Sequence, residues 1–276
     1  MRILYIALAI GIIGTVTFFV VKNSFETKST GRFDALSARQ KIEKDKILIK
    51  KIEDLPEPIR RWLSQCGALS KLDIQYMDMK HVGEMRLDPE SNKWLSAKAT
   101  QRVGVLEPGF AWQVKADVAP GLRVLGLDSL IEGRAEMVIR LLGVFPVANV
   151  KDTPEVNEST MHRYLLEMGW YPQLALHKDI SWTAIDKNTA KASLQAGDSD
   201  VSVIIEINDK GQFIGSKAYR YYDGKDDLQR RPFEGRVTSH TVFDGVEIPR
   251  EMEAVWMLES GPFKWYKVKV VSAEFH

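Results

Sequence analysis

The chain is divided in two by the stretch Thr160-Met-His-Arg-Tyr-Leu-Leu-Glu-Met-Gly-Trp-Tyr-Pro-Gln-Leu-Ala-Leu-His177. The apolar residues of this stretch recur at the spacing of one helix face: Met161, Tyr164, Leu165 and Met168. Gly169 and Pro172 end the helical pattern. Because the segments on both sides have the two-residue period of β-strands, we predict one central helix inserted between two sets of strands.

The flanking segments alternate apolar and polar residues and are separated by turn residues such as Asp223-Gly224 and Asp244-Gly245. The expected strands lie near 72–87, 93–105, 110–119, 122–141, 189–194, 201–207, 213–222, 236–243, 248–258 and 265–275. No strand–helix–strand alternation is present, which argues against a parallel sheet. The predicted fold class is mainly antiparallel β (α+β), one large curved sheet or half-barrel with the helices on its concave face. A closed barrel plugged by a helix is the alternative.

The amino terminus has no charged residue from Ile3 to Val21. As a helix this run is about 28 Å long, close to the hydrocarbon thickness of a bilayer. It is longer than the apolar core of a signal peptide, and no small-residue cleavage pattern follows it. We therefore predict a transmembrane anchor at 1–21, a charged connector at 22–52 and a single half-barrel-like domain at 53–276.

We therefore expect a single-pass protein of the cell membrane, which contacts the membrane through residues 3–21. The positive-inside rule favours a cytoplasmic body, because the cations after the anchor are Lys22, Lys28, Arg32, Arg39 and Lys41. The formal net charge of +1 gives no indication of nucleic-acid binding. The single cysteine, Cys66, excludes an internal disulfide and Cys-rich zinc sites. Nothing in the sequence specifies an oligomeric state.

Glu167 is the candidate catalytic residue, because a carboxylate held among aromatic side chains can have a raised pKa and act as an acid or base. The alternative is a structural ion pair with Arg163, four residues earlier on the same helix. The predicted ligand-binding residues are Arg163, Tyr164, Glu167, Trp170, Tyr171, Trp182 and Trp112.

No metal site or cofactor is predicted. His162 and Glu167 are five residues apart, about 500° around a helix, so they do not share a face. No nucleophile elbow, phosphate-binding loop or dinucleotide fingerprint occurs. One basic cluster is interpreted as a solvated hairpin: Arg220, Lys225, Arg230, Arg231 and Arg236.

The segments Leu55–Leu63, Arg163–Pro172, Trp182–Asp186 and Gly245–Pro249 resemble an uncharacterised bacterial family, a domain of unknown function that often carries an amino-terminal membrane span. The resemblance covers about residues 45–276. The order of helix, strands, helix and strands separately resembles the half-barrel of LolA/LolB-like lipoprotein carriers. That second resemblance implies a concave apolar cavity for acyl chains and a body on the extracytoplasmic side.

Together these features predict a membrane-anchored, non-catalytic binding protein that holds a lipid or other apolar ligand in a concave β-sheet cavity. One alternative is an enzyme with Glu167 as general acid or base. The other is a structural or partner-binding envelope protein.

Overall fold

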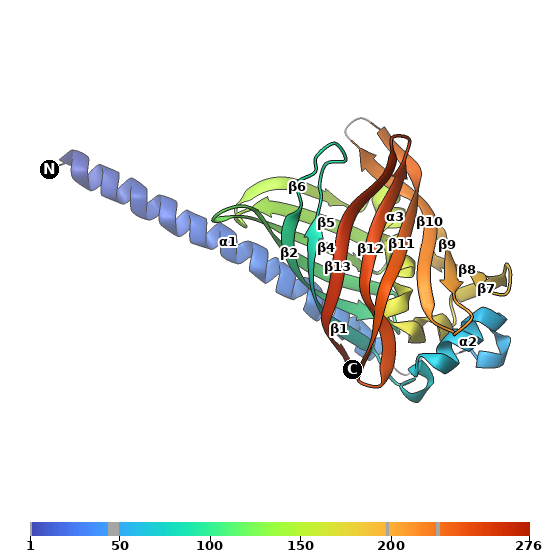
Figure 1. The fold of residues 1–276 in the computed structure, drawn as a ribbon. Helices are drawn as coiled ribbons and strands as arrows, with labels where there is room; N and C mark the ends of the chain where they lie inside the picture. Colours follow the sequence, from blue (N-terminus) through green and yellow to red (C-terminus); the bar gives the residue numbers. More distant parts are fainter. Residues whose placement is uncertain (1, 44–49, 197–198, 225–226) are drawn as a thin grey trace.

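The computed structural model describes residues 2–43, 50–196, 199–224 and 227–276, with side chains described from residue 20 onward except at 42–49, 196–199 and 223–227. In these ranges thirteen strands form one sheet in the order β6-β5-β4-β3-β2-β1-β13-β12-β11-β10-β9-β8-β7 (Figure 1). The strands are β1 (Tyr76–Met85), β2 (Leu95–Gly104), β3 (Gly109–Ala119), β4 (Leu122–Ile131), β5 (Arg134–Leu141), β6 (Phe145–Lys151), β7 (Ile180–Ala184), β8 (Thr189–Ala196), β9 (Ser199–Ile207), β10 (Phe213–Gly224), β11 (Asp227–Phe243), β12 (Val246–Leu258) and β13 (Gly261–Phe275).

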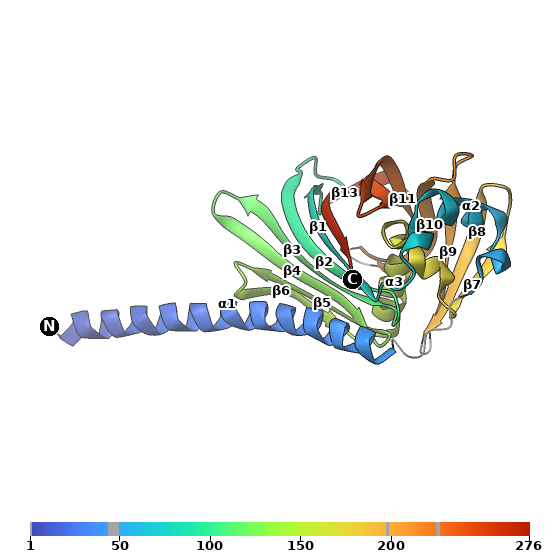
Figure 2. The same ribbon diagram turned by 90° about the horizontal axis from the view of Figure 1, so that it is seen from below.

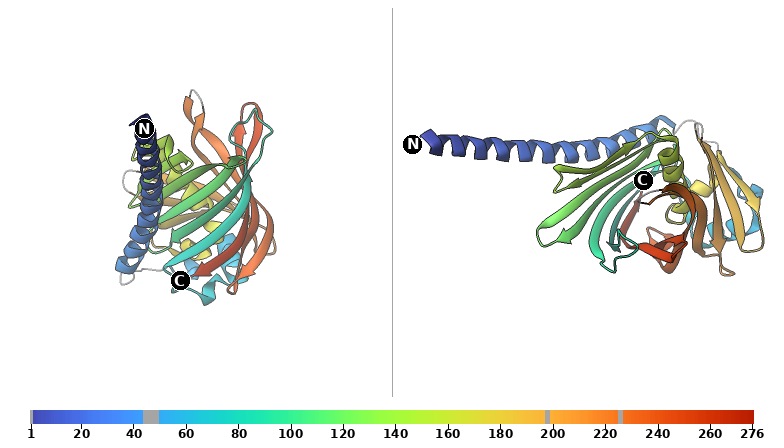
Figure 3. Two further views of the ribbon diagram at one scale, coloured as in Figure 1. Left: turned by 90° about the vertical axis from the view of Figure 1, so that its left-hand side faces the viewer. Right: turned by 90° about the horizontal axis from the view of Figure 1, so that it is seen from above.

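Every neighbouring pair of strands is antiparallel, as predicted. The helical elements are α1 (Arg2–Glu43), η2 (Ile52–Asp54), α2 (Glu57–Gln65), η3 (Ala68–Ser70), α3 (Pro154–Leu166), η4 (Met168–Trp170) and η5 (Pro172–Leu176). α3 contacts β9 and β10 near one end of the sheet and β3 to β6 near the other. It therefore lies across the concave side of a half-barrel, and the sheet curves around it (Figure 3). The predicted half-barrel is confirmed.

The central helix begins earlier and ends sooner than predicted. Thr153 is its N-cap, with the side-chain oxygen accepting a hydrogen bond from the amide of Val156, and Pro154 occupies the first turn. Beyond Leu166 the chain tightens into the 3-10 helices η4 and η5. Its apolar stripe is buried as expected, so the error lies in the boundaries and not in the placement.

The predicted set of strands differs from the observed set at three places. The expected strand 122–141 is two strands, β4 and β5, because Glu132 and Gly133 adopt positive φ angles of 54° and 73° and reverse the chain. Phe145–Lys151, for which no strand was predicted, form the edge strand β6. The short strand β7 at the other edge was not predicted.

α1 occupies the face of the sheet opposite α3, where it contacts β2, β3 and β4. Its residue Glu26 accepts a hydrogen bond from Gln113 at 3.0 Å, and Gln113 alternates with inward-facing residues of β3. Phe25 packs there in a small second core with Leu125, Leu127 and Val138. The part of the chain predicted as a connector therefore covers the outer face of β2 to β4 (Figure 2).

Ion pairs also hold the same part of α1 on the sheet. Lys28 and Arg32 contact the carboxylate of the buried residue Glu136 at 2.6 and 2.5 Å. Burial acts to raise the pKa of Glu136, but the two cations outweigh it and hold the pKa below its ordinary value.

Within the described residues no helix combines the length and apolar character that crossing a membrane requires. In the predicted anchor at 1–21, the backbone of residues 2–21 is described as part of α1, whereas the side chains of residues 1–19 are not described.

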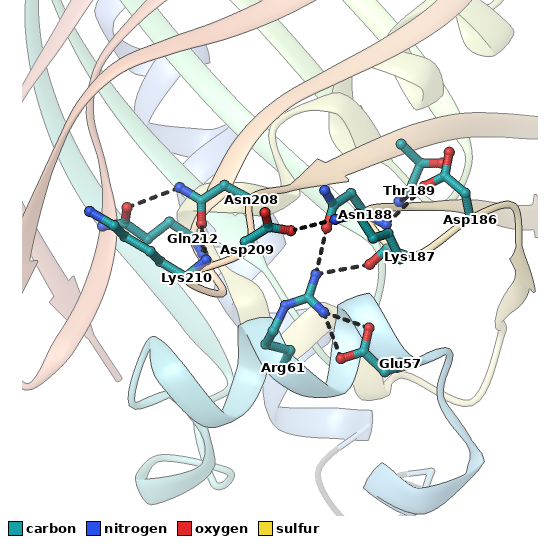
Figure 4. Close-up of polar contacts among 10 residues, drawn as sticks. All are labelled: Glu57, Arg61, Asp186, Lys187, Asn188, Thr189, Asn208, Asp209, Lys210 and Gln212. Atoms are coloured by element: carbon teal, nitrogen blue, oxygen red, sulfur yellow. Dashed lines mark hydrogen bonds and ion pairs between the residues drawn. The ribbon is translucent and has the colours of Figure 1, made fainter.

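α2 packs against two hairpin turns, β7–β8 and β9–β10, and the Arg61 side chain bonds the first of them (Figure 4). The guanidinium contacts Glu57 at 2.6 Å and donates to the carbonyl of Lys187 and the side-chain oxygen of Asn188, both at 2.9 Å. Gly211 closes the second turn against the same helix, and an added Cβ there would lie 3.0 Å from the carbonyl oxygen of Arg61. The apolar face of α2 joins the main core, where Trp62 packs on Phe213 at 5.4 Å.

Candidate functional site

A buried ion group lies where α3 crosses the concave face. The Arg163 guanidinium donates to Asp128 on β4 at 2.5 Å and to Glu167 at 2.8 Å. It lies 4.7 Å from the ring centres of both Phe110 and Trp112 on β3. These cation–π contacts and the two carboxylates compensate the loss of hydration of the cation.

Glu167 has both carboxylate oxygens engaged. One accepts from Arg163, and the other accepts from the side-chain amide of Gln101 on β2 at 2.7 Å. An acid–base role would therefore require one of these contacts to break during the reaction. The geometry matches the structural ion pair that was the alternative interpretation of Glu167.

Arg220 is a second cation at the same place. Its guanidinium donates to Ser159 at 3.1 Å and lies over the rings of Phe233 and Trp256, at 5.1 and 5.4 Å. Burial, and then the charge of Arg163, lower the pKa of Arg220 to about 10. The pKa of Asp128 shifts upward through burial, with Arg163 opposing the shift. The group thus carries two positive and two negative side chains in the interior.

The interpretation of the Arg220 cluster as a solvated hairpin is wrong for this residue. Arg220 lies on the inward face of β10 with Ser216, whose hydroxyl donates to the carbonyl of Leu166 on α3. The other described cations form ion pairs outside the site: Arg230 with Glu158, Arg231 with Glu259, and Arg236 with Glu234. Lys225 lies outside the described residues.

A cavity of about 60 Å³ adjoins this group. Its lining is mostly apolar, but several buried polar atoms on it have no hydrogen-bond partner: both ring nitrogens of His81, Oε1 of Gln101, Nε1 of Trp265 and the hydroxyl of Tyr266. Leaving such an atom unsatisfied costs about 1–3 kcal/mol. Four side chains from β1, β2 and β13 therefore converge on one small space with unused hydrogen-bonding capacity.

The size of the cavity limits what it can hold. A water molecule takes about 30 Å³ in the liquid, and pockets for drug-sized ligands have about 300–1,000 Å³. The cavity thus holds a small polar group and not a complete acyl chain. Solvent reaches the ion group beside it, since the side chains of Arg163, Asp128 and Glu167 are 16%, 17% and 17% exposed.

The structure brings together four of the seven predicted ligand-binding residues. Arg163, Glu167, Trp170 and Trp112 line the cavity. The hydroxyl of Tyr164 instead donates to the carbonyl of Gly104 at 2.7 Å, and that of Tyr171 to the carbonyl of Tyr164.

Trp182 lies on β7, away from the cavity, and donates to the carbonyl of Ala175 at 2.9 Å. The indole of Trp170 on η4 donates to the carbonyl of Pro249 on β12 at 3.0 Å, which connects the segment after α3 to the opposite part of the sheet.

The sequence reasoning missed His81, Gln101, Arg220, Trp265 and Tyr266. His81 and Gln101 occupy inward positions of β1 and β2, next to Ala99 and Val103. A polar residue at an inward position of a strand was the signal available for both. Among the described residues, no three His, Cys, Asp or Glu side chains are grouped so that they could hold a metal ion.

His81 makes the stability of the protein depend on pH. Burial, and then the charge of Arg163, lower its pKa from 6.5 to about 3. Between these values the unfolded chain binds a proton that the folded chain excludes, so stability falls as the pH falls below 6.5. Between pH 7 and pH 5 this group alone should remove about 2 kcal/mol of unfolding free energy.

We expect the His81→Gln variant to lose this part of the pH dependence, as measured by urea unfolding at pH 7 and pH 5. Burial also lowers the pKa of His162, to about 4. His162 contributes equally to the pH dependence of stability in both proteins, so its contribution cancels in the difference between them. Identical pH slopes for the two proteins would contradict the buried, neutral state of His81.

The fold and the site define a β half-barrel protein whose concave face is covered by a helix and contains a small, mostly apolar cavity with unpartnered polar atoms on its wall. Residues 53–275 match the family of unknown function DUF6920, and the chain belongs to this family. The family prediction from the sequence is confirmed. The comparison with curated proteins gave no match.

Two solved structures are similar at low sequence identity. A LolA superfamily protein from Nitrosomonas europaea has 9% identity and a TM-score of 0.39, covering 78% of this chain and 93% of its own. A beta-barrel-like protein of the domain of unknown function DUF1849 from Brucella abortus has 9% identity and a TM-score of 0.32, covering 74% and 98%. Both likenesses are too distant to indicate a ligand for this chain.

Proposed function

We propose that this protein is a membrane-anchored, non-catalytic binding protein, and that the cavity beside Arg163 holds the polar group of an otherwise apolar ligand. The observation that carries the proposal is the convergence of unpartnered, buried polar atoms on one apolar-walled cavity. Retaining several unsatisfied polar groups in one place costs stability, and a bound partner that satisfies them offsets the cost.

The unpartnered atoms also restrict the chemistry of the ligand. The Trp265 indole can only donate a hydrogen bond, the Gln101 oxygen can only accept one, and the Tyr266 hydroxyl can do both. A hydroxyl, a primary amide or a protonated carboxyl group both donates and accepts, and each is small enough for the cavity. The expected ligand therefore carries one such group on an apolar body, as a lipid-like molecule does.

Membrane anchoring is the other half of the proposal and rests on the uncharged run from Ile3 to Val21. Alkaline carbonate extraction of membranes should leave the full chain in the pellet. Protease accessibility in spheroplasts then assigns the body to one side of the membrane. The resemblance to lipoprotein carriers slightly favours the extracytoplasmic side, although the cations after residue 21 favour the cytoplasmic side.

Ligand binding is tested by native mass spectrometry of the full chain purified in mild detergent. We expect a bound mass that the Ala254→Leu variant loses, because Ala254 lines the cavity and the added atoms occupy part of its volume. Ala184→Leu is the matched control, since residue 184 is exposed on the edge strand β7. Wild-type protein that is repeatedly recovered empty, or an equal bound mass in all three proteins, would contradict a ligand in this cavity.

A further inference from the structure

The turn between β5 and β6 exposes apolar side chains next to α1. On β6, Phe145 is 55% and Val147 is 62% exposed. On the neighbouring stretch of α1, Val20 is 62% exposed. β6 is the last strand at this end of the sheet, so no further strand covers these residues.

The conformation of this turn is unusual for its sequence. Leu142 and Gly143 have φ angles of 56° and 76°, and the amide of Val144 donates to the carbonyl of Leu141 at 3.1 Å. Turns with two left-handed central residues normally use Asn-Gly or Asp-Gly. A leucine in the left-handed region costs about 1–2 kcal/mol. The chain therefore keeps a strained, partly exposed leucine at the tip, and such outliers point to a function.

The turn packs against the part of α1 where the uncharged run ends. Arg140 donates to the carbonyl of Val21 at 3.4 Å and to the hydroxyl of Ser24 at 3.2 Å. A Cβ added at Gly143 would lie 3.5 Å from the Lys22 side chain. Figure 2 shows the ends of β5 and β6 beside α1. The apolar turn thus lies at the level of Lys22, the first charged residue after Ile3–Val21.

Cations surround this apolar tip. Lys22 is exposed on α1, and Arg140 lies between the turn and α1. The backbone carbonyl of Arg123 accepts a hydrogen bond from the Leu142 amide, and the Arg123 side chain is 64% exposed and forms an ion pair with Asp117 at 2.6 Å. Each Lys or Arg near an anionic membrane surface contributes about 1 kcal/mol of attraction. Apolar side chains flanked by cations are the pattern of a surface that lies in the membrane interface.

We propose that the β5–β6 turn is a second membrane contact, which places Leu142, Phe145 and Val147 in the headgroup region of a bilayer containing anionic phospholipid. The contact rests on the proposed anchoring by residues 3–21. The half-barrel is then held against the bilayer at two points and does not move freely on a stalk. An apolar ligand leaving the bilayer would meet the body directly.

The test uses the full chain in nanodiscs of phosphatidylcholine and phosphatidylglycerol that contain doxyl-labelled lipid. A bimane label is placed on the Phe145→Cys variant and, as the control, on Val242→Cys. Val242 is 60% exposed and lies next to the β11–β12 turn, which packs against Gly67 beyond the end of α2. The native Cys66 should not react, because it is buried and burial raises its pKa to about 11.

We expect doxyl lipid to quench the label at 145 at least about threefold more than the label at 242, and the difference to shrink in discs without phosphatidylglycerol. Equal quenching at the two positions in chains that co-purify with nanodiscs would overturn the second contact and leave the anchor intact. Failure of the chain to enter nanodiscs would overturn the anchor and the contact together. Quenching that does not depend on the presence of phosphatidylglycerol would overturn the proposed attraction of the cations to anionic lipid.

Discussion

Replacement of Arg163 by leucine is expected to lower the free energy of unfolding by about 3–5 kcal/mol, because it leaves two buried carboxylates without their cation. Asp128 and Glu167 each accept a hydrogen bond from this guanidinium, at 2.5 and 2.8 Å. The variant also loses the contacts with Phe110 and Trp112. Urea unfolding at pH 7 followed by circular dichroism measures the loss.

The pH dependence of the same variant provides an internal check. Without the cation, the charge of Arg163 no longer opposes the effect of burial, so the folded-state pKa of Asp128 rises further and this carboxyl protonates in the folded protein at a higher pH than in the unfolded one. Stability is then gained as the pH falls through the folded-state pKa of Asp128, and the deficit relative to wild type should be smaller at pH 5 than at pH 7.

Two further variants separate charge from packing. Arg163→Lys keeps the charge but cannot bond both carboxylates in a fixed geometry, so an intermediate loss is expected. The triple variant Arg163→Leu, Asp128→Asn, Glu167→Gln removes Arg163 and both carboxylates, leaves Arg220 as the remaining charge of the group, and should be more stable than Arg163→Leu alone. A loss below about 1 kcal/mol for Arg163→Leu is typical of a solvent-screened surface pair and would contradict a buried group.

The architecture could be predicted because alternation along single strands identifies inward residues without knowledge of their neighbours. Phe110, Trp112, Val114 and Ala116 of β3 are all in the main core, as their spacing indicates. The errors concern turns whose residues carry no strong signal. Glu132-Gly133 and Leu142-Gly143 reverse the chain in left-handed conformations that neither Glu nor Leu favours.

The candidate site could be predicted only where its contacts are local. Arg163 and Glu167 are one helical turn apart, so their pairing follows from the sequence. Asp128 and Gln101 reach the same group from strands whose register relative to α3 is set by the whole sheet.

Arg220 illustrates the same limit on β10. The pairing of β9 with β10 shifts between Phe213 and Gly215, and a shift of one residue exchanges the inward and outward faces. Because other arginines surround it in the sequence, Arg220 was predicted to point outward. The shifted register turns it inward.

The outer-face packing of α1 was missed because its buried stripe is only half apolar. The fully buried side chains on this part of the helix are Phe25, Ser29, Leu36 and Gln40. Their spacing is helical, but two of the four are polar and give no amphipathic signal. Gln40 is buried because its side chain bonds the β2–β3 turn, accepting from the amides of Leu106 and Glu107 and donating to the carbonyl of Glu107.

A chain that begins at Lys50 is therefore expected to be less stable than a chain that begins at Lys22 by about 5 kcal/mol. Removing Phe25 and Leu36 lowers the free energy of unfolding by about 1.5–3 kcal/mol for each buried apolar side chain. Truncation also removes both ion-pair partners of Glu136, Lys28 and Arg32. The buried carboxylate is then unsatisfied, which lowers the free energy of unfolding by about 1–3 kcal/mol. The sum approaches the whole stability of many domains, so the shorter chain should be partly unfolded or aggregated at 25 °C.

Thermal unfolding of the two truncated chains, and of Phe25→Ala in the longer one, measures these contributions separately. Phe25→Ala alone should remove about 3–5 kcal/mol, since its ring fills the space between Leu125, Leu127 and Val138. The DUF6920 match begins only at residue 53, and the charged composition of 22–52 predicted a connector. Equal unfolding temperatures for the two truncated chains would restore that prediction. The expected difference would instead make residues 22–43 part of the folded body and couple its stability to the helix that contains the uncharged run Ile3–Val21.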